Sequence, residues 1–303
     1  MTIAELQRQF LAYGDQRIAP EDFFILLSYA LEKDKVFILS HPEYSINSKH
    51  EERARSFFSR RVEREPVAFI LGHKEFYGID FTVTQNTLIP RPETEMLVDL
   101  ALEEIKKLKM KNGSRKKISV IDVGTGSGNI IISVVKTLKN NHAKFDKFEF
   151  YGIDNFSLAL KIARYNAKKH KVDKKIKFLK GNLLKPFTQK LKTENQKLKT
   201  IILANLPYLS HTIYAKTAKD VRDFEPKDAL VSKQNGLAHY YRLLKSLKDI
   251  PHLPQVTLFL EISPEQKFSL KKYIATLFPD ARVVTKKDLA GKERVFEIRT
   301  TLS

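Results

Sequence analysis

The sequence predicts an α/β fold, in which a small N-terminal helical domain and a β-hairpin precede a doubly wound, mostly parallel sheet of seven strands. From residue 118 onward, short β-rich runs alternate with segments of helical periodicity, which is typical of a parallel sheet covered by helices on both faces. Before residue 74 the apolar residues follow a helical period. We therefore expect a helical domain at 1–73, a hairpin linker at 74–92 and an α/β domain at 93–303.

The helical domain is predicted from two helix-start signals and the apolar faces that follow them. Thr2 and Glu5 have the spacing of a capping box, and Ser48 and Glu51 repeat it. The apolar residues at helical spacing are Ile3, Leu6, Phe10, Phe23, Phe24, Leu27, Leu31, Ala54, Phe57, Phe58 and Val62. No catalytic motif accompanies them.

The linker is predicted from a change of period after residue 74. Residues 76–83 alternate around Gly78, as a β-hairpin does. The run Ile89-Pro90-Arg91-Pro92 cannot continue a helix, but Pro92 suits the first position of the next one. Glu93 and Glu95 would then lie at the positive end of that helix.

The sheet is predicted from β-rich runs, and its helices from apolar faces between them. We expect strands at 118–123, 148–153, 176–179, 200–204, 256–262, 282–285 and 295–299. One helix follows the first strand and buries Ile131, Val134, Val135 and Leu138, and a later helix spans 237–247. Between them, Leu158, Ile162 and Tyr165 lie at helical spacing, which predicts a further buried face.

A glycine-rich loop follows the first strand of this sheet. Residues 120–129 read VIDVGTGSGN, so the glycines have the spacing Gly-x-Gly-x-Gly, which differs from dinucleotide and phosphate loops. Glycines let a ligand approach the backbone, and a helix N-terminus favours a carboxylate. S-adenosylmethionine, which has a carboxylate and no phosphate, fits this loop. The candidate cofactor-binding residues here are Asp122, Gly124, Thr125, Gly126, Ser127 and Gly128.

Polar residues also end the next two strands. Asp154 ends the second strand, where an acid can accept hydrogen bonds from both ribose hydroxyls of a nucleoside. Asn182 and Leu183 follow the third strand, where an adenine ring would lie. Asn182 could bind its amino group and Leu183 could pack on its face. We expect these three residues to complete the cofactor site.

The fourth strand ends in Asn205-Leu206-Pro207-Tyr208, at the same edge of the sheet as the glycine loop. Methyl transfer to a planar NH2 group needs two hydrogen-bond acceptors in the plane of the nitrogen, and the Asn205 side chain and the Leu206 carbonyl can supply them. Pro207 favours an extended Leu206, and Tyr208 can pack on the planar group. We expect these four residues to bind the substrate, with Asn205 also facing the cofactor, and we expect no general base.

At this point the sequence resembles a known family. Residues 122–128 and 205–208 resemble class I, S-adenosylmethionine-dependent amino-methyltransferases. The segments PVAFILG (66–72), EFYG (75–78) and IPRPETE (89–95) resemble the domain junction of the HemK-type peptide chain release factor N5-glutamine methyltransferases. Further matches follow in order at 225–226, 235–237, 260–262 and 288–295, so the resemblance covers nearly the whole chain.

The resemblance implies a specific reaction and specific partners. It implies methyl transfer from S-adenosylmethionine to the N5 amide of the glutamine in the Gly-Gly-Gln motif of peptide chain release factors. It also implies the seven-stranded methyltransferase sheet and a helical domain, 1–73, that binds the substrate.

One residue departs from the family and leaves alternatives open. The family usually has Asn-Pro-Pro-Tyr, whereas this chain has Leu206 in place of the first proline. Asn-Leu-Pro-Tyr also resembles ribosomal RNA adenine methyltransferases, which carry their helical domain after the cofactor strand. Here the helical domain comes first, which favours the glutamine reaction. A non-catalytic, ribosome-associated protein that binds the cofactor is the third interpretation.

Charge and composition bound the remaining properties. Lys and Arg number 54 against 35 Asp and Glu, a net charge of +19, with basic stretches at 106–117, 168–180 and 185–199. We interpret these stretches as solvated surface that assists encounter with an acidic protein or the ribosome, with no nucleic acid required. The chain has no cysteine, no paired histidine spacing and no long apolar run, so we expect no metal and no membrane. A cytoplasmic monomer is the expectation.

Overall fold

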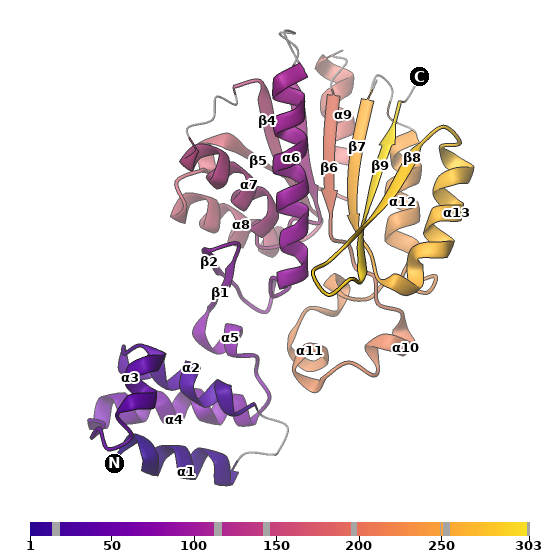
Figure 1. Ribbon diagram of the computed structural model, residues 1–303. Coiled ribbons are helices and arrows are strands. Elements are labelled where there is room, and N and C mark those ends of the chain that lie inside the picture. The colour runs from indigo at the N-terminus through magenta and orange to yellow at the C-terminus, as the bar shows by residue number, and fades with distance from the viewer. Residues whose placement is uncertain are drawn as a thin grey trace. The chain divides into compact units, whose positions relative to one another are not determined.

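Figure 1 shows the computed structural model, which describes residues 1–13, 19–111, 117–141, 146–194, 199–248, 250 and 255–301. The chain divides into two compact units. The first contains Met1–His73 and Thr217–Phe224, and the second contains Lys74–Lys216 and Glu225–Ser303. The hairpin therefore groups with the α/β unit, and a short segment from late in the chain groups with the helical unit. Parts of two basic stretches, 112–116 and 195–198, lie outside the described residues.

The first unit is helical. Its helices are α1 (Ile3–Tyr13), α2 (Pro20–Leu31), α3 (Lys35–Ser40), α4 (Ser48–Val62), α5 (Val67–Leu71) and α11 (Lys219–Phe224). The rings of Phe10, Phe23 and Phe58 meet in its core, with centroids 4.5 to 5.6 Å apart. The buried Arg61 of α4 donates to Asp22 at 2.7 Å and lies 3.6 Å from Asp220 of α11.

Of the two predicted capping boxes, the first is confirmed and the second is wrong. The Thr2 N–H donates to Glu5 at 2.8 Å, and the Glu5 N–H donates to the Thr2 hydroxyl at 3.2 Å. Helix α4 begins at Ser48, but its cap is Asn47, whose side chain accepts from the His50 N–H at 2.9 Å. An asparagine oxygen caps a helix as well as serine does, and here it stands one position earlier.

The second unit contains a two-stranded hairpin and a seven-stranded sheet. The hairpin consists of β1 (His73–Phe76) and β2 (Ile79–Thr82). The sheet strands are β3 (Ile118–Val123), β4 (Phe148–Asp154), β5 (Ile176–Lys180), β6 (Lys199–Ala204), β7 (Gln255–Glu261), β8 (Arg282–Lys287) and β9 (Glu293–Thr300). Their order is β5-β4-β3-β6-β7-β9-β8, parallel except for β9, which pairs antiparallel with both β7 and β8. The predicted fold class is confirmed.

Helices cover both faces of the sheet (Figure 1). Helices α6 (Glu95–Lys111), α7 (Asn129–Asn140) and α8 (Ser157–Lys169) cover one face. Helices α9 (Lys185–Glu194), α12 (Ala238–Lys248) and α13 (Lys267–Leu277) cover the other. The remaining elements are η1 (Pro92–Thr94), η2 (Asp173–Lys175), α10 (His211–Tyr214), η3 (Lys227–Ala229) and η4 (Pro264–Gln266). In the described part of the chain no helix is long and apolar enough to cross a membrane.

Helix α8 buries a different face from the one predicted. Leu158 and Tyr165 are 57% and 58% exposed, whereas the small residues Ala159, Ala163 and Ala167 are buried. A Cβ atom at Gly128 would lie only 3.3 Å from the Cβ of Ala163, so the helix packs closely on the glycine loop. Close packing favours small residues at this contact, and the larger side chains therefore point outward.

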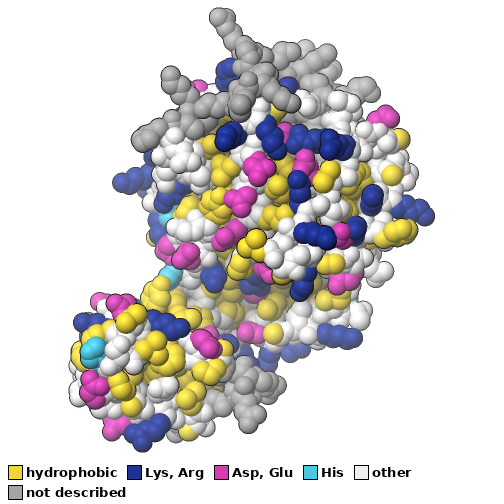
Figure 2. Space-filling view, in the orientation of Figure 1, with side chains coloured by type: hydrophobic (Ala, Val, Ile, Leu, Met, Phe, Trp, Pro, Cys, Tyr) yellow, Lys and Arg dark blue, Asp and Glu magenta, His cyan; other side chains and the backbone are white. Residues whose placement is uncertain are grey.

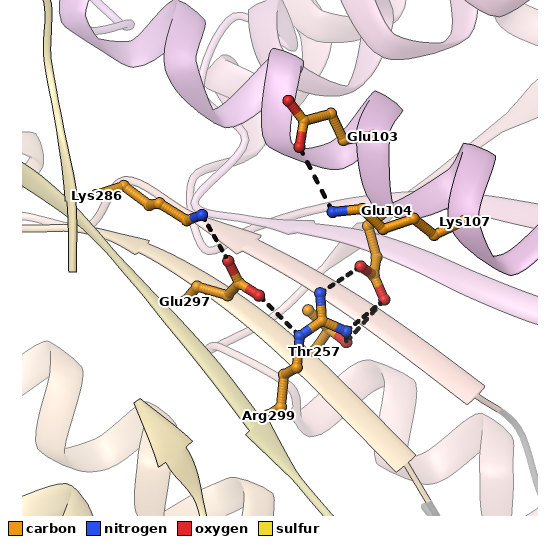
Figure 3. A network of polar contacts seen from close by, with 7 residues as sticks. All are labelled: Glu103, Glu104, Lys107, Thr257, Lys286, Glu297 and Arg299. Carbon is orange, nitrogen blue, oxygen red and sulfur yellow. Dashed lines mark hydrogen bonds and ion pairs between the residues drawn. The ribbon is translucent and has the colours of Figure 1, made fainter. Parts of the chain in front are cut away.

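An ion-pair network joins helix α6 to the antiparallel edge of the sheet (Figure 3). The Arg299 guanidinium binds the buried Glu104 carboxylate through two nitrogens and also donates to Glu297 at 2.7 Å. Lys286 lies 3.3 Å from Glu297. These contacts hold the pKa of Glu297 below its ordinary value, against the effect of its burial. The network fixes α6, which follows the linker, against β7 and β9.

Removing the arginine of this network is expected to destabilise the α/β unit. Arg299→Ala leaves the Glu104 carboxylate buried without its charged partner, so the free energy of unfolding falls by about 2 kcal/mol, since partial exposure of Arg299 weakens the pair. The double variant Glu104→Leu/Arg299→Met removes both charges and should recover most of the loss. Urea unfolding of both variants measures this, and equal losses in the two would contradict it.

Candidate active site

The predicted site residues lie at the point where the order of the sheet reverses. The central strand β3 pairs in parallel with β4 on one side and with β6 on the other. Ligands of open α/β sheets bind beyond the carboxyl ends of the strands at such a point. A cavity of about 720 Å³ lies there, and its lining includes Gly124, Gly126, Asp154, Asn182, Leu183, Asn205, Leu206 and Pro207.

The glycine loop contributes two residues to the cavity wall and places the others behind it. Gly124 and Gly126 line the cavity, whereas Asp122, Thr125, Ser127 and Gly128 do not. The buried Thr125 hydroxyl donates to Asp122 at 2.6 Å, which ties the loop to the end of β3. Gly128 caps α7. These four predicted cofactor residues are therefore placed to shape the loop from within.

Asp154 connects the glycine loop to β4. One carboxylate oxygen accepts from the Gly126 N–H and the other from the Phe156 N–H, both at 2.9 Å. Burial raises the pKa of Asp154 above its ordinary value, and these backbone hydrogen bonds oppose that shift. Each oxygen keeps a further lone pair, so the carboxylate can accept from hydroxyl groups in the cavity.

The buried Asp122 makes stability depend on pH. Burial raises its pKa from 3.8 to about 7, so the folded state binds this proton more tightly than the unfolded state does. The free energy of unfolding should therefore fall as pH rises from about 4 to 7, by at most about 1.4 kcal/mol per pH unit from this group. The Asp122→Asn variant lacks this titrating group. The free energy of unfolding of the variant, relative to that of wild type, should therefore increase between pH 5 and 8. Urea unfolding across this range measures it, and parallel profiles would contradict it.

Asn205 follows the last residue of β6, and its side-chain amide contacts a buried threonine. Its Nδ2 donates to the Thr94 hydroxyl at 2.9 Å. This leaves Oδ1 as the acceptor that the side chain can offer to a ligand. Leu206 follows it on the cavity wall, although its side chain is buried.

Two polar residues, Tyr240 and Gln266, lie against the backbone that follows Asn205. The buried Tyr240 hydroxyl lies 2.6 Å from the Glu261 carbonyl and 3.3 Å from the Leu206 carbonyl. Its single proton serves the nearer oxygen, so the Leu206 carbonyl keeps acceptor capacity. Gln266 donates to the Tyr208 carbonyl at 3.1 Å and to the Gly236 carbonyl at 3.0 Å. Tyr208 does not line the cavity; its half-buried ring packs against the neighbouring core.

Two loops form further parts of the cavity wall, and a buried glutamate ties them together. Residues 85–88 line the cavity from the linker, and residues 226–229 line it from the region of η3. Glu225 accepts from the Ile89 N–H at 3.1 Å and forms an ion pair with Arg91. The linker is therefore held at the cavity by a residue far away in the sequence.

Several residues that build this site were not predicted from the sequence. Thr94 carried a detectable signal, because it belongs to the Arg-Pro-Glu-Thr-Glu segment, but nothing local indicated its contact with Asn205. His239 and Arg242 line the cavity from α12, where helical spacing alone suggested a core helix. They also line a neighbouring cavity of about 770 Å³, together with Lys227, Lys233 and Lys245. Among the described residues no group of three His, Asp or Glu could hold a metal ion.

Comparison with known proteins shows which family has this arrangement. Residues 5–72 match the PrmC N-terminal domain family, and residues 114–245 match a methyltransferase domain family. The release factor glutamine methyltransferase of Clostridium botulinum is 33% identical, over 92% of this chain and 91% of that protein. That of Bacillus subtilis is 33% identical over 89% and 88%, and that of Bacillus anthracis is 31% identical over 89% of each.

The chain belongs to the release factor glutamine methyltransferases. Solved methyltransferases share the fold. The catalytic domain of human METTL16 bound to an RNA hairpin superposes with a TM-score of 0.54 at 14% identity, covering 92% of this chain and 91% of that chain. The N-terminal domain of human METTL16 with SAH gives 0.52 at 15% identity, covering 96% and 99%. Along this release factor glutamine methyltransferase chain, the match to the PrmC N-terminal domain precedes the match to the methyltransferase domain.

Proposed function

We propose that this chain transfers a methyl group from S-adenosylmethionine to the N5 amide of the glutamine in the Gly-Gly-Gln motif of peptide chain release factors. One observation carries the proposal: the Asn205 side chain and Leu206 line the same cavity as the glycine loop and Asp154. Two acceptors for a planar NH2 group thus lie beside a site for a nucleoside. The relatives that the chain resembles are named release factor glutamine methyltransferases, which supports this substrate.

The cavity residues fit the proposed cofactor. The two cavity-facing glycines leave the backbone open to the amino-acid part of the cofactor, the Asp154 carboxylate can accept from ribose hydroxyls, and Asn182 and Leu183 can bind the adenine. Asp122, Thr125, Ser127 and Gly128 support the loop from behind. When bound, S-adenosylmethionine supplies a methyl group activated by its sulfonium.

The protein residues hold the glutamine nitrogen for the transfer. The Asn205 Oδ1 and the Leu206 carbonyl accept hydrogen bonds from the two N–H groups of the glutamine amide. The lone pair of the nitrogen is then directed at the methyl group. Pro207 lines the cavity beside the glutamine side chain, and Tyr208 supports it from the core behind. As the N–C bond forms and the S–C bond breaks, the two acceptors stabilise the positive charge that develops on nitrogen. The nitrogen then releases one proton to solvent.

No general base is needed in this scheme, although His239 lines the cavity. Burial, with the nearby Arg242 charge, lowers the pKa of His239, and its Nδ1 lies 2.8 Å from the Ser232 hydroxyl. We interpret His239 as a residue that lines the cavity and takes no part in proton transfer. His239→Gln is expected to keep kcat within about fivefold of wild type, because loss of a true general base costs about 10²–10⁴. Steady-state methylation measures it, and a loss of a hundredfold would make His239 the base.

The positive charge of the chain would act when the protein and its substrate first meet. Figure 2 shows Lys and Arg scattered among acidic and apolar side chains on the visible face, which suits general attraction better than a single nucleic-acid track. The cavity lined by Lys227, Lys233 and Lys245 adds cationic groups beside the site. We propose that this surface attracts acidic parts of the release factor or the ribosome.

The helical domain is proposed to bind the release factor. Several apolar side chains of this unit are exposed, among them Val36 and Leu39 of α3, and such side chains favour protein contacts. Hydrogen–deuterium exchange with and without release factor should show protection within 1–73, and its absence there would contradict this role.

We further propose a cytoplasmic monomer, since release factors act in translation. Sedimentation analysis tests its state of assembly.

A methyl-transfer experiment tests the proposed function. The purified chain is incubated with S-adenosylmethionine labelled in its methyl group and with either purified release factor or ribosomal RNA. Label should enter the release factor, and it should be absent when the glutamine of its Gly-Gly-Gln motif is replaced by alanine. Label in RNA would favour an adenine methyltransferase, and label in neither substrate would favour a binding protein.

A further inference from the structure

We propose that Thr94 and Glu261 are positioning residues that set the orientation of the Asn205 side-chain amide. This inference rests on the proposed function, because it explains how the acceptor that Asn205 offers to the substrate is selected. An asparagine amide can rotate so that its NH2 group exchanges places with its oxygen. Only one of the two orientations presents an acceptor to the glutamine N–H.

The fold brings these three side chains together from distant segments. Thr94 ends η1, immediately after the linker, and Asn205 follows the last residue of β6. Glu261 ends β7, and the register of β6 with β7 places Ala204 beside Leu260, so Asn205 and Glu261 extend neighbouring strands. Thr94 is 2% exposed and Glu261 is 4% exposed. Water therefore does not compete for their hydrogen bonds.

The chemistry of the three groups permits one pattern of hydrogen bonds. Above its pKa of about 7 Glu261 is ionised, so its carboxylate can only accept, and both Thr94 and Asn205 donate to it. The single Thr94 proton is then committed, so the Thr94 oxygen accepts, and it receives the Asn205 Nδ2 at 2.9 Å. A rotated amide would direct its oxygen at two acceptors, which is repulsive. The oxygen of Asn205 is consequently directed away from Thr94 and Glu261.

The electrostatics of Glu261 agree with this role. Burial raises its pKa to about 7, and the Glu93 charge raises it too, while the Thr94 hydrogen bond, the Arg294 charge and the Asn205 hydrogen bond lower it. A buried carboxylate costs stability unless it is hydrogen-bonded. The Thr94 and Asn205 hydrogen bonds lower the pKa of this carboxylate, whereas its Oε2 has no hydrogen-bond partner among the described residues.

Threonine variants test the inference with a matched control. Thr94→Val keeps the shape of the side chain and removes its hydroxyl, so kcat should fall roughly ten- to a hundredfold, with the KM for S-adenosylmethionine and release factor within twofold of wild type. Thr94→Ser should restore most of kcat. Thr200→Val is the control, because Thr200 is also 2% exposed and its hydroxyl has no hydrogen-bond partner among the described residues. Its kcat should match wild type.

A second measurement does not depend on the substrate. In the protein labelled with ¹⁵N-asparagine, the Asn205 side-chain amide protons should exchange slowly with water in wild type and Thr94→Ser, and rapidly in Thr94→Val. The signal is assigned by its loss in Asn205→Asp. Equal exchange rates, wild-type kcat in Thr94→Val, or no rescue by serine would each overturn the inference. If Thr94→Val fails to fold, the same measurements are made on Glu261→Gln. An unchanged kcat and an unchanged exchange rate in that variant would also overturn the inference.

The design separates this inference from the proposed function. Absence of methyl transfer by the wild-type chain would contradict the proposed substrate, whereas the exchange measurement would still report on the Asn205 amide. Normal transfer by wild type together with an unaffected Thr94→Val variant would contradict the positioning role alone.

Discussion

Asn205→Ala is expected to lower kcat for methyl transfer by about 10²–10³, while the affinity for S-adenosylmethionine changes by less than threefold. The reason is that the Asn205 Oδ1 is an acceptor whose direction is set before the substrate arrives, through the hydrogen bond from Nδ2 to Thr94. Its interaction strengthens as positive charge develops on the glutamine nitrogen, so its loss acts on the transition state more than on the ground state. Single-turnover kinetics with labelled cofactor measure the rate of this step.

Asn182→Ala provides the matched control for Asn205→Ala. Asn182 lines the same cavity from the end of β5 and has the same side chain, but its proposed partner is the adenine of the cofactor. Its replacement should weaken S-adenosylmethionine binding, measured by calorimetry, and leave the rate at saturating cofactor within about threefold of wild type. If instead Asn205→Ala weakens cofactor binding and keeps its kcat, the two assignments must be exchanged.

The strands could be predicted because their signals are local. Each strand of the sheet is a short run of buried residues, such as the fully buried β3, and its sequence shows this without knowledge of its neighbours. The glycine loop and Asn205 could be placed at one edge because parallel strands share their carboxyl ends. The exposed side of α8 could not be predicted, since its burial depends on how closely the helix approaches Gly128.

The contacts that finish the site could not be read from the sequence. Thr94 and Asn205 are 111 residues apart in the chain, and Ile89 and Glu225 are 136 residues apart. No periodicity connects such pairs, because their meeting depends on the path of the linker and on the order of the strands. Sequence motifs therefore identified several residues that line the cavity, while the residues that hold them in place became visible only in the fold.

Gly236→Ala is expected to disrupt the substrate side of the site more than any other single-methyl change described here. Gly236 has a φ of +86°, and a Cβ atom there would lie 1.9 Å from the Tyr208 carbonyl oxygen and 2.7 Å from the Gln266 Nε2. These two groups are hydrogen-bonded to each other, so the added methyl must push apart the contact that holds the Asn-Leu-Pro-Tyr segment. A displacement of about 1 Å can cost a hundredfold in rate. We expect kcat to fall at least that much, with a loss of roughly 3 kcal/mol in the free energy of unfolding.

Gly291→Ala separates backbone strain from this steric effect. Gly291 has a φ of +77°, and no atom of the described residues lies within 4 Å of the position where its Cβ would stand. The same substitution therefore adds only the strain of a left-handed alanine, about 1 kcal/mol, and should leave kcat unchanged. Circular dichroism, urea unfolding and methylation kinetics on both variants distinguish the two costs. If Gly236→Ala loses no more stability and no more activity than Gly291→Ala, the backbone of residues 205–208 can move without harm, and the placement of its carbonyls is not what sets the rate.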